Sequence, residues 1–185
     1  MPGASLLVRA LTDDLGPDPV ADGLNACGEL AIKCLLLCLA CTPLRIVFGW
    51  TLQMRARKHL GLLAFTYALA HFSVYLFVDH RGAIAEAIKE MLDKPFTLVG
   101  LAAFVLLLPL AFTSTKGAIK RLGGKRWNRL HQLVYVVGIL AVVHYVMRAK
   151  KDTTEAMIHG AILALLLAVR IFEKVRRRVG RRVTA

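Results

Sequence analysis

Six histidines are the residues of this 185-residue chain best suited to chemistry, at positions 59, 71, 80, 131, 144 and 159. His71 and His144 lie well inside uncharged apolar stretches, and His131 lies at the start of the stretch that holds His144. A histidine in such surroundings is costly unless it has a partner, a proton path or a metal. Imidazole is also a common axial ligand of haem iron. The histidines therefore suggest a haem site, with hydrogen-bonded packing as the alternative.

The spacing of four histidines pairs them at two depths. His59 and His71 are 12 residues apart in one apolar stretch, and His131 and His144 are 13 apart in another. On helices these spacings correspond to about 18 Å and roughly 20 Å, but they also rotate the side chain by roughly 120–140°. If the two helices run in the same direction, His71 lies level with His144 and His59 with His131. We expect the first pair to bind haem and keep the second as a candidate for a second haem.

His59 lies in a basic stretch beside Arg57 and Lys58, and this position suggests an alternative to iron ligation. These three residues could instead contact a lipid phosphate, a quinone or a haem propionate. Of the two remaining histidines, we expect His80 to be solvated or interfacial, and His159 is an alternative outer ligand.

The apolar stretches are long enough to position such a site inside a membrane. The chain is 57% hydrophobic with a mean hydropathy of +0.57, against about 45–50% apolar residues in soluble domains. Crossing the hydrocarbon takes about 20 helical residues, and lone strands would leave backbone groups unpaired there. We therefore predict an all-α membrane bundle and exclude a disordered chain or an ordinary globular enzyme. The expected spans are 29–48, 60–78, 96–114, 130–147 and 156–172.

The charges between the spans predict the topology. Loops 45–59 and 115–129 and the tail from Glu173 carry a net charge of +15, whereas residues 1–29, 79–95 and 148–155 carry −4. Because Lys and Arg accumulate on the cytoplasmic side, we expect a periplasmic N-terminus and a cytoplasmic C-terminus. The overall charge of +13 then reflects topology and attraction to anionic lipid, and we expect no nucleic-acid partner.

Two further patterns have ordinary structural explanations. Cys34, Cys38 and Cys41 have the spacing of an iron–sulfur motif, but within an apolar span they share one helical face. We expect them to be packing thiols. Ile84, Ile88, Met91 and Leu92 recur at helical spacing in the loop 79–95, which suggests either a short amphipathic helix or a polar connector.

The most specific motif is the stretch 113–145, TSTKGAIKRLGGKRWNRLHQLVYVVGILAVVHY. The stretches RKHLGLLAFTYALAHFSVYL (57–76), CTPLR (41–45) and LGPDPV (15–20) agree with it. Together they resemble the MsrQ family, also called YedZ, which are haem-binding membrane subunits of periplasmic methionine sulfoxide reductase systems in Gram-negative bacteria. The resemblance extends from Leu15 to the fifth expected span.

The resemblance implies a ferric-reductase-like transmembrane bundle in the bacterial inner membrane that binds haem b, one or two per chain. The family's haem histidines fall on His71, His131 and His144. It also implies FMN, without assigning residues to it. Electrons would come from the quinone pool or a flavin donor and pass to the periplasmic molybdenum subunit MsrP, which repairs methionine sulfoxide. No catalytic residue is expected here, because sulfoxide reduction would belong to the partner.

Two alternatives stay open at this point: a stand-alone haem-containing ferric or quinone reductase, and a haem-free transporter or scaffold. The chain also departs from the family in two ways. Members usually have one more helix before the segment at 15–20, and His59 is not inherited from the resemblance. We expect residues 1–28 to form a periplasmic segment, 29–172 the haem-binding membrane domain and 173–185 a basic cytoplasmic tail.

Overall fold

The computed structural model describes residues 19–51, 53–149 and 152–183, which contain helices and no strand. Five helical units in this part of the chain are long and apolar enough to cross a membrane. The prediction of an all-α bundle with five spans is therefore confirmed. The elements are α2 (Pro19–Phe48), α3 (Gln53–Ser73), the π-helix η1 (Val74–Asp79), α4 (Ile84–Asp93), α5 (Pro95–Phe112), α6 (Lys116–Leu122), α7 (Gly124–Leu130), α8 (Leu133–Arg148) and α9 (Thr154–Val183).

Two helices extend well beyond their hydrophobic spans. α2 begins at Pro19 and includes the last ten residues of the segment expected to be polar and periplasmic, while residues 1–18 lie outside the described part. α9 continues to Val183 through most of the basic tail. Hydropathy locates apolar stretches and does not mark where a helix continues in polar surroundings, which explains both differences. Pro19 is favourable at a helix start because its missing N–H has no partner there.

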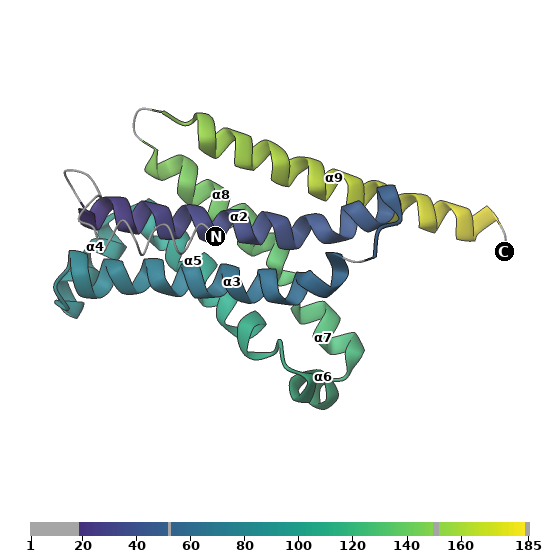
Figure 1. Cartoon of the computed structure of the whole chain (residues 1–185), viewed down its shortest axis with the longest axis horizontal. Helices are drawn as coiled ribbons and strands as arrows, with labels where there is room; N and C mark the ends of the chain where they lie inside the picture. The colour runs from purple at the N-terminus through teal and green to yellow at the C-terminus, as the bar shows by residue number, and fades with distance from the viewer. Residues whose placement is uncertain (1–18, 52, 150–151, 184–185) are drawn as a thin grey trace.

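α2 lies at the centre of the packing. It contacts α3 on one side and α9 on the other, while α8 lies against α5 and α9 (Figure 1). A Cβ at Gly138 of α8 would lie 3.3 Å from Leu163 of α9 and 3.4 Å from Leu39 of α2. The glycine therefore allows three helices to approach closely. The interior is made of aliphatic side chains that include Leu35, Leu39, Leu107, Val137 and Leu163.

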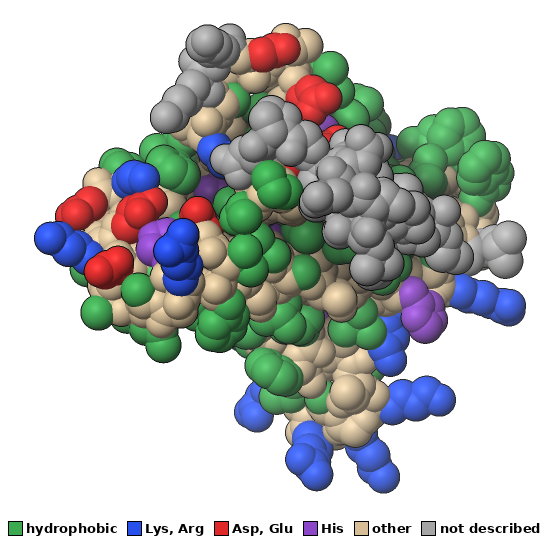
Figure 2. All heavy atoms as spheres, turned by 60° about the vertical axis from the view of Figure 1, so that its left-hand side comes forward, with side chains coloured by type: hydrophobic (Ala, Val, Ile, Leu, Met, Phe, Trp, Pro, Cys, Tyr) green, Lys and Arg blue, Asp and Glu red, His purple; other side chains and the backbone are tan. Residues whose placement is uncertain are grey.

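The two ends of the bundle differ in shape and charge. At one end, called here the α4 end, α4 connects η1 to α5; at the other, the short helices α6 and α7 project from the bundle (Figure 1). Lys and Arg side chains gather on one projection, while hydrophobic side chains cover much of the visible sides (Figure 2). The Thr115 hydroxyl caps α6 by accepting a hydrogen bond from the Ala118 N–H at 3.1 Å.

α4 is the amphipathic helix suggested by the loop sequence. Met91 and Ala87 face the bundle and are 7% and 0% exposed, whereas Ile84, Ile88 and Leu92 are exposed. The apolar residues of this helix form one stripe of which a part is covered. The edge with Ala87 and Met91 holds α4 against the bundle, and the edge with Ile84, Ile88 and Leu92 is exposed.

Arg170 of α9 ties three spans together away from the α4 end. Its guanidinium donates hydrogen bonds to the Tyr135 hydroxyl of α8 and to the Leu39 carbonyl oxygen of α2, the latter at 2.6 Å. The charge also lies 5.0 Å from the centre of the Tyr135 ring, a cation–π contact. An arginine inside an apolar bundle is costly, and these contacts offset part of that cost.

Candidate functional site

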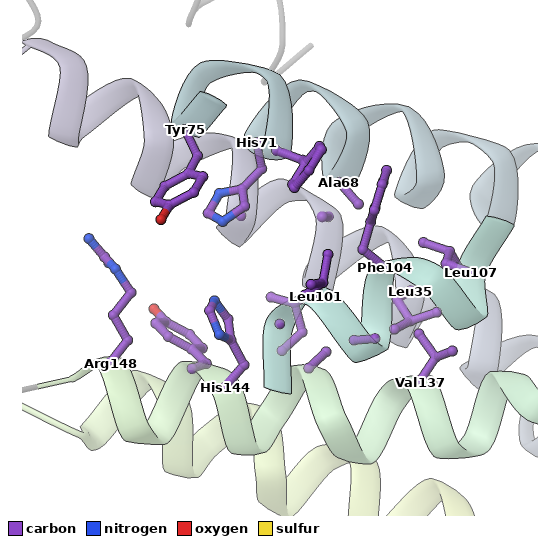
Figure 3. A pocket seen from close by; sticks show the side chains of 18 of the residues that line it. Leu35, Ala68, His71, Tyr75, Leu101, Phe104, Leu107, Val137, His144 and Arg148 are labelled. Atoms are coloured by element: carbon purple, nitrogen blue, oxygen red, sulfur yellow. The ribbon is translucent and has the colours of Figure 1, made fainter. Parts of the chain in front are cut away.

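A cavity between α2, α3, α5 and α8 contains His71 and His144 (Figure 3). His71 comes from α3 and His144 from α8, and their rings point toward one another across the gap. The ring centres are 6.2 Å apart and the ring planes are 87° apart. The structure therefore brings together the pair that sequence spacing placed at one depth.

Each imidazole is held by a backbone carbonyl of a neighbouring helix. His71 Nδ1 lies 2.8 Å from the Leu24 carbonyl oxygen of α2, and His144 Nδ1 lies 2.7 Å from the Phe96 carbonyl oxygen of α5. A carbonyl oxygen only accepts hydrogen bonds, so both Nδ1 atoms carry the proton. The lone pair of each neutral ring is then on Nε2. Such an Nδ1–H bond fixes the ring orientation of metal-binding histidines in proteins.

Glycines opposite the two rings let them lie directly against helix backbones. A Cβ at Gly28 of α2 would lie 3.1 Å from His71 Nδ1, and one at Gly100 of α5 would lie 2.7 Å from His144 Nδ1. No ordinary side chain fits at the second position without moving the ring. The glycines are thus part of the geometry that places both imidazoles.

The lining of the cavity changes from apolar to polar along its length. Phe104, Leu107 and Val137 line one part, whereas Tyr75 and Arg148 lie at the α4 end beyond the histidines (Figure 3). An elongated ligand with one apolar and one polar edge would match this lining.

The donor set fits a bis-imidazole metal centre. Bonds from a metal to imidazole nitrogen are about 2.0–2.1 Å, and adding the distance from each nitrogen to its ring centre puts two opposed rings about 6 Å apart. The separation of 6.2 Å agrees with this value. The described residues hold no group of three or more His, Cys, Asp or Glu side chains that could bind a metal ion by themselves. A macrocycle that supplies the remaining donors is therefore the kind of metal group that suits this pair.

His131 lies elsewhere, at the junction of α7 and α8. Its Nε2 is 3.0 Å from the Thr113 hydroxyl oxygen, and its ring stacks on Trp127 with centres 3.9 Å apart. Trp127 in turn donates from Nε1 to the Thr113 carbonyl oxygen at 2.9 Å. These three side chains connect the end of α5 to the start of α8.

The structure does not bring His59 and His131 together. His59 is exposed on α3 and makes no hydrogen bond or ion pair within the described chain. Lys58 is also exposed, and Arg57 is half-buried with its carbonyl oxygen accepting a bond from Cys38 Sγ at 3.3 Å. The rotation of roughly 120–140° along each helix accounts for the separation, since one helix can present only one of its two histidines to the same neighbour.

His80 and His159 have local partners outside the cavity. His80 Nε2 lies 3.0 Å from Glu90 and its Nδ1 lies 3.1 Å from the Tyr75 carbonyl oxygen. Burial lowers the pKa of His80, but these bonds and the nearby carboxylates outweigh it and raise the pKa above 6.5. The hydrogen bonds from Lys94 and His80 lower the pKa of Glu90. His159 Nδ1 bonds the Glu155 carbonyl oxygen at 2.6 Å within α9.

The cysteines are free thiols, as their apolar surroundings predicted. Cys38 and Cys41 are buried in α2, and Cys34 and Cys27 are partly buried. Cys38 Sγ donates a hydrogen bond to the Arg57 backbone carbonyl oxygen, and Cys41 Sγ donates one to the Leu37 carbonyl oxygen at 3.4 Å. These contacts are those of packing residues.

Several residues of the cavity carried no usable sequence signal. Gly28 and Gly100 were ordinary small residues of apolar helices, and Tyr75 and Arg148 lay at span ends where polar residues are common. The positions of the two glycines and of the two imidazoles depend on contacts between residues 43 to 48 positions apart, such as Gly28 with His71 and His144 with the Phe96 carbonyl. The spacing of His144 and Arg148 at i and i+4 could have linked those two, because such residues share one helical face.

Comparison of the sequence with known proteins shows the family to which the chain is similar. The family of ferric reductase like transmembrane components matches residues 27–142. A relative from Herminiimonas arsenicoxydans is 44% identical over 93% of this chain and 80% of its own length. Relatives from Rhodospirillum rubrum (42%, over 92% and 82%) and Xanthomonas euvesicatoria (44%, over 94% and 80%) are similar to the same extent. All three are named protein-methionine-sulfoxide reductase heme-binding subunit MsrQ.

Proposed function

The chain belongs to the MsrQ family of haem-binding subunits, and from this premise we propose that it conducts electrons through the membrane to a periplasmic methionine sulfoxide reductase. The observation that carries the proposal is the pair of opposed imidazoles of His71 and His144 in an apolar cavity. Both offer Nε2 to the same space, which is the arrangement that two axial ligands of one haem b require. Haem supplies one-electron redox chemistry at this position.

The residues of the chain set the conditions for that chemistry. The Leu24 and Phe96 carbonyls hold His71 and His144 in the tautomer that leaves Nε2 free. The apolar wall that includes Phe104 would surround a bound group with side chains of low polarity. In haem proteins, axial ligands, hydrogen bonds to them and burial are the means by which the protein tunes the potential.

We extend the proposal to a second redox site near His131. Its present partner is the Thr113 hydroxyl, so iron ligation by His131 would replace that hydrogen bond. His59, Arg57 and Lys58 lie toward the same end on α3, and we propose that they contact a propionate or a quinone. We also propose FMN as a further cofactor, without assigning residues to it.

The proposed donor is a membrane quinol or a flavin, and the proposed acceptor is an MsrP-type molybdenum subunit in the periplasm. One feature supports a role in conduction: His71 and His144 face each other in a cavity inside the bundle, where they could hold a redox group. We also propose a location in the bacterial inner membrane with a periplasmic N-terminus, an orientation that the loop charges support. Sulfoxide reduction then takes place on the partner.

A reconstituted electron-transfer assay tests this proposal. The full chain in lipid vesicles is given a quinol, and the periplasmic molybdenum subunit is added with a peptide containing methionine sulfoxide. We expect sulfoxide reduction that requires the wild-type chain and is lost in His71→Ala and His144→Ala. Haem reduction without transfer to the partner would favour the stand-alone ferric or quinone reductase. A chain without haem would favour the transporter or scaffold.

A further inference from the structure

Arg148 lies at the polar part of the cavity that contains His71 and His144. It is the last residue of α8, one helical turn beyond His144, and it lines the same cavity as both histidines. Its side chain extends from α8 toward the region of Tyr75 on the opposite side (Figure 3). The guanidinium and the two imidazoles therefore face one cavity.

This guanidinium has no partner among the described residues. It makes none of the hydrogen bonds or ion pairs found there, and it is the sole Lys or Arg that lines the cavity in that part of the chain. Glu29, the carboxylate that lines the cavity in the described chain, and Glu155 of α9 both have other partners. Glu29 pairs with Lys33, and Glu155 accepts a hydrogen bond from the Tyr145 hydroxyl at 2.9 Å.

The opposite part of the cavity cannot accept a charged group. Leu35, Leu107 and Val137 line it and belong to the buried aliphatic core. A carboxylate there would lose its hydration without gaining a donor. The two parts of the cavity thus distinguish the two edges of an amphipathic ligand.

We infer that Arg148 binds a propionate carboxylate of the haem held between His71 and His144, so that the carboxylate edge faces the α4 end. The inference rests on the proposed function, because it presupposes haem at this pair. A guanidinium matches a carboxylate through two parallel hydrogen bonds. The bound carboxylate would in turn supply the partner that Arg148 lacks.

The first test compares haem with its dimethyl ester, which lacks both carboxylates, and needs no variant. The full chain in detergent micelles is depleted of haem and refilled with either compound, and uptake of haem itself is checked first. We expect wild type to bind haem about tenfold more tightly than the ester, because the ester cannot accept the charge-assisted hydrogen bonds of the guanidinium; tenfold corresponds to about 1.4 kcal/mol. Equal affinity for haem and ester would overturn the inference.

The second test measures the rate at which the filled protein loses haem to excess apomyoglobin. Arg148→Gln should release haem about tenfold faster than wild type and should not distinguish haem from the ester, and Arg148→Lys should be intermediate. Lys89→Gln is the matched control, because Lys89 is an exposed cation of α4 at the same end, and its release rate should equal that of wild type. Release from Arg148→Gln at the wild-type rate would contradict the inference.

These outcomes separate this inference from the proposed function. If wild type takes up no haem, the haem site at His71 and His144 fails, and the role of Arg148 fails with it. If wild type binds haem but neither test shows a contribution from Arg148, the axial site stands and the propionate contact is wrong. If Arg148→Gln does not accumulate, the ester comparison on wild type still decides.

Discussion

Gly100→Ala is the substitution that tests the geometry of the two imidazoles most sharply. The new methyl group would lie 2.7 Å from His144 Nδ1 and 2.8 Å from Cε1, so the ring must retreat by about 0.7 Å to reach ordinary contact at 3.4 Å. That movement acts directly on the atom that bonds the Phe96 carbonyl oxygen at 2.7 Å. We expect the ring to turn, and Nε2 to leave its place opposite His71.

Two opposing energies set the magnitude of the effect. Replacing glycine by alanine inside a helix stabilises it by about 0.8–1.0 kcal/mol, whereas overpacking costs about 1–3 kcal/mol. Net stability should therefore fall by no more than about 2 kcal/mol. The loss at the site should be larger than the loss of stability, because an axial bond depends on ring position to a fraction of an ångström.

Gly28→Ala and Gly23→Ala complete a graded series. At Gly28 the methyl group would meet His71 at 3.1 Å, a displacement of about 0.3 Å, and at Gly23 nothing lies within 4 Å. Haem content per protein and the absorption spectrum of the purified variants are the assay. We expect wild-type values for Gly23→Ala, a partial loss for Gly28→Ala and the greatest loss for Gly100→Ala. Full haem content with an unchanged spectrum in Gly100→Ala would refute the placement of His144.

Two further substitutions test contacts outside the cavity. Tyr135→Phe removes a hydrogen bond from the half-buried guanidinium of Arg170 and should lower the free energy of unfolding by about 1.5–3 kcal/mol. Thermal unfolding in micelles measures this loss, and an unchanged midpoint would count against the contact. Glu90→Gln removes the partner of His80, whose folded pKa is raised above 6.5 while that of Glu90 is lowered below 4.5. The ion pair stabilises the folded protein only while Glu90 is ionised and His80 is protonated, which holds between those two pKa values. Its contribution to the free energy of unfolding disappears as the pH rises through the raised pKa of His80. The stability lost in the variant should therefore be larger at about pH 5.5 than at about pH 8.5 by about 0.2–1 kcal/mol, and a difference independent of pH would exclude the ion pair.

The number of spans and the His71–His144 pair could be predicted because both depend on patterns along single helices. Apolar stretches of about 20 residues indicate spans, and spacings along two helices indicate depth. The helix ends could not be predicted in the same way. Residues 19–28 of α2 lie outside the expected span and most of the basic tail is charged, yet both are helical. Hydropathy does not show where a helix continues beyond an apolar stretch.

The partners of the histidines could not be predicted, because they are backbone atoms and small residues of other helices. His71 is oriented by the Leu24 carbonyl and the space beside Gly28, and neither has a side chain that signals the role. The second pair shows the limit of an argument from depth alone. His59 and His131 lie toward the same end of the bundle but are not brought together, because rotation around each helix matters as much as depth.

The most direct test of the central claim is the electron paramagnetic resonance spectrum of the oxidised, purified protein, recorded for wild type and for His71→Ala and His144→Ala. We expect a low-spin haem signal from the site between His71 and His144, strongly anisotropic because the ring planes are 87° apart, and the complete loss of this signal in each variant. Retention of that signal in either variant, or a wild-type protein without haem, would contradict the claim that these two residues hold one haem iron.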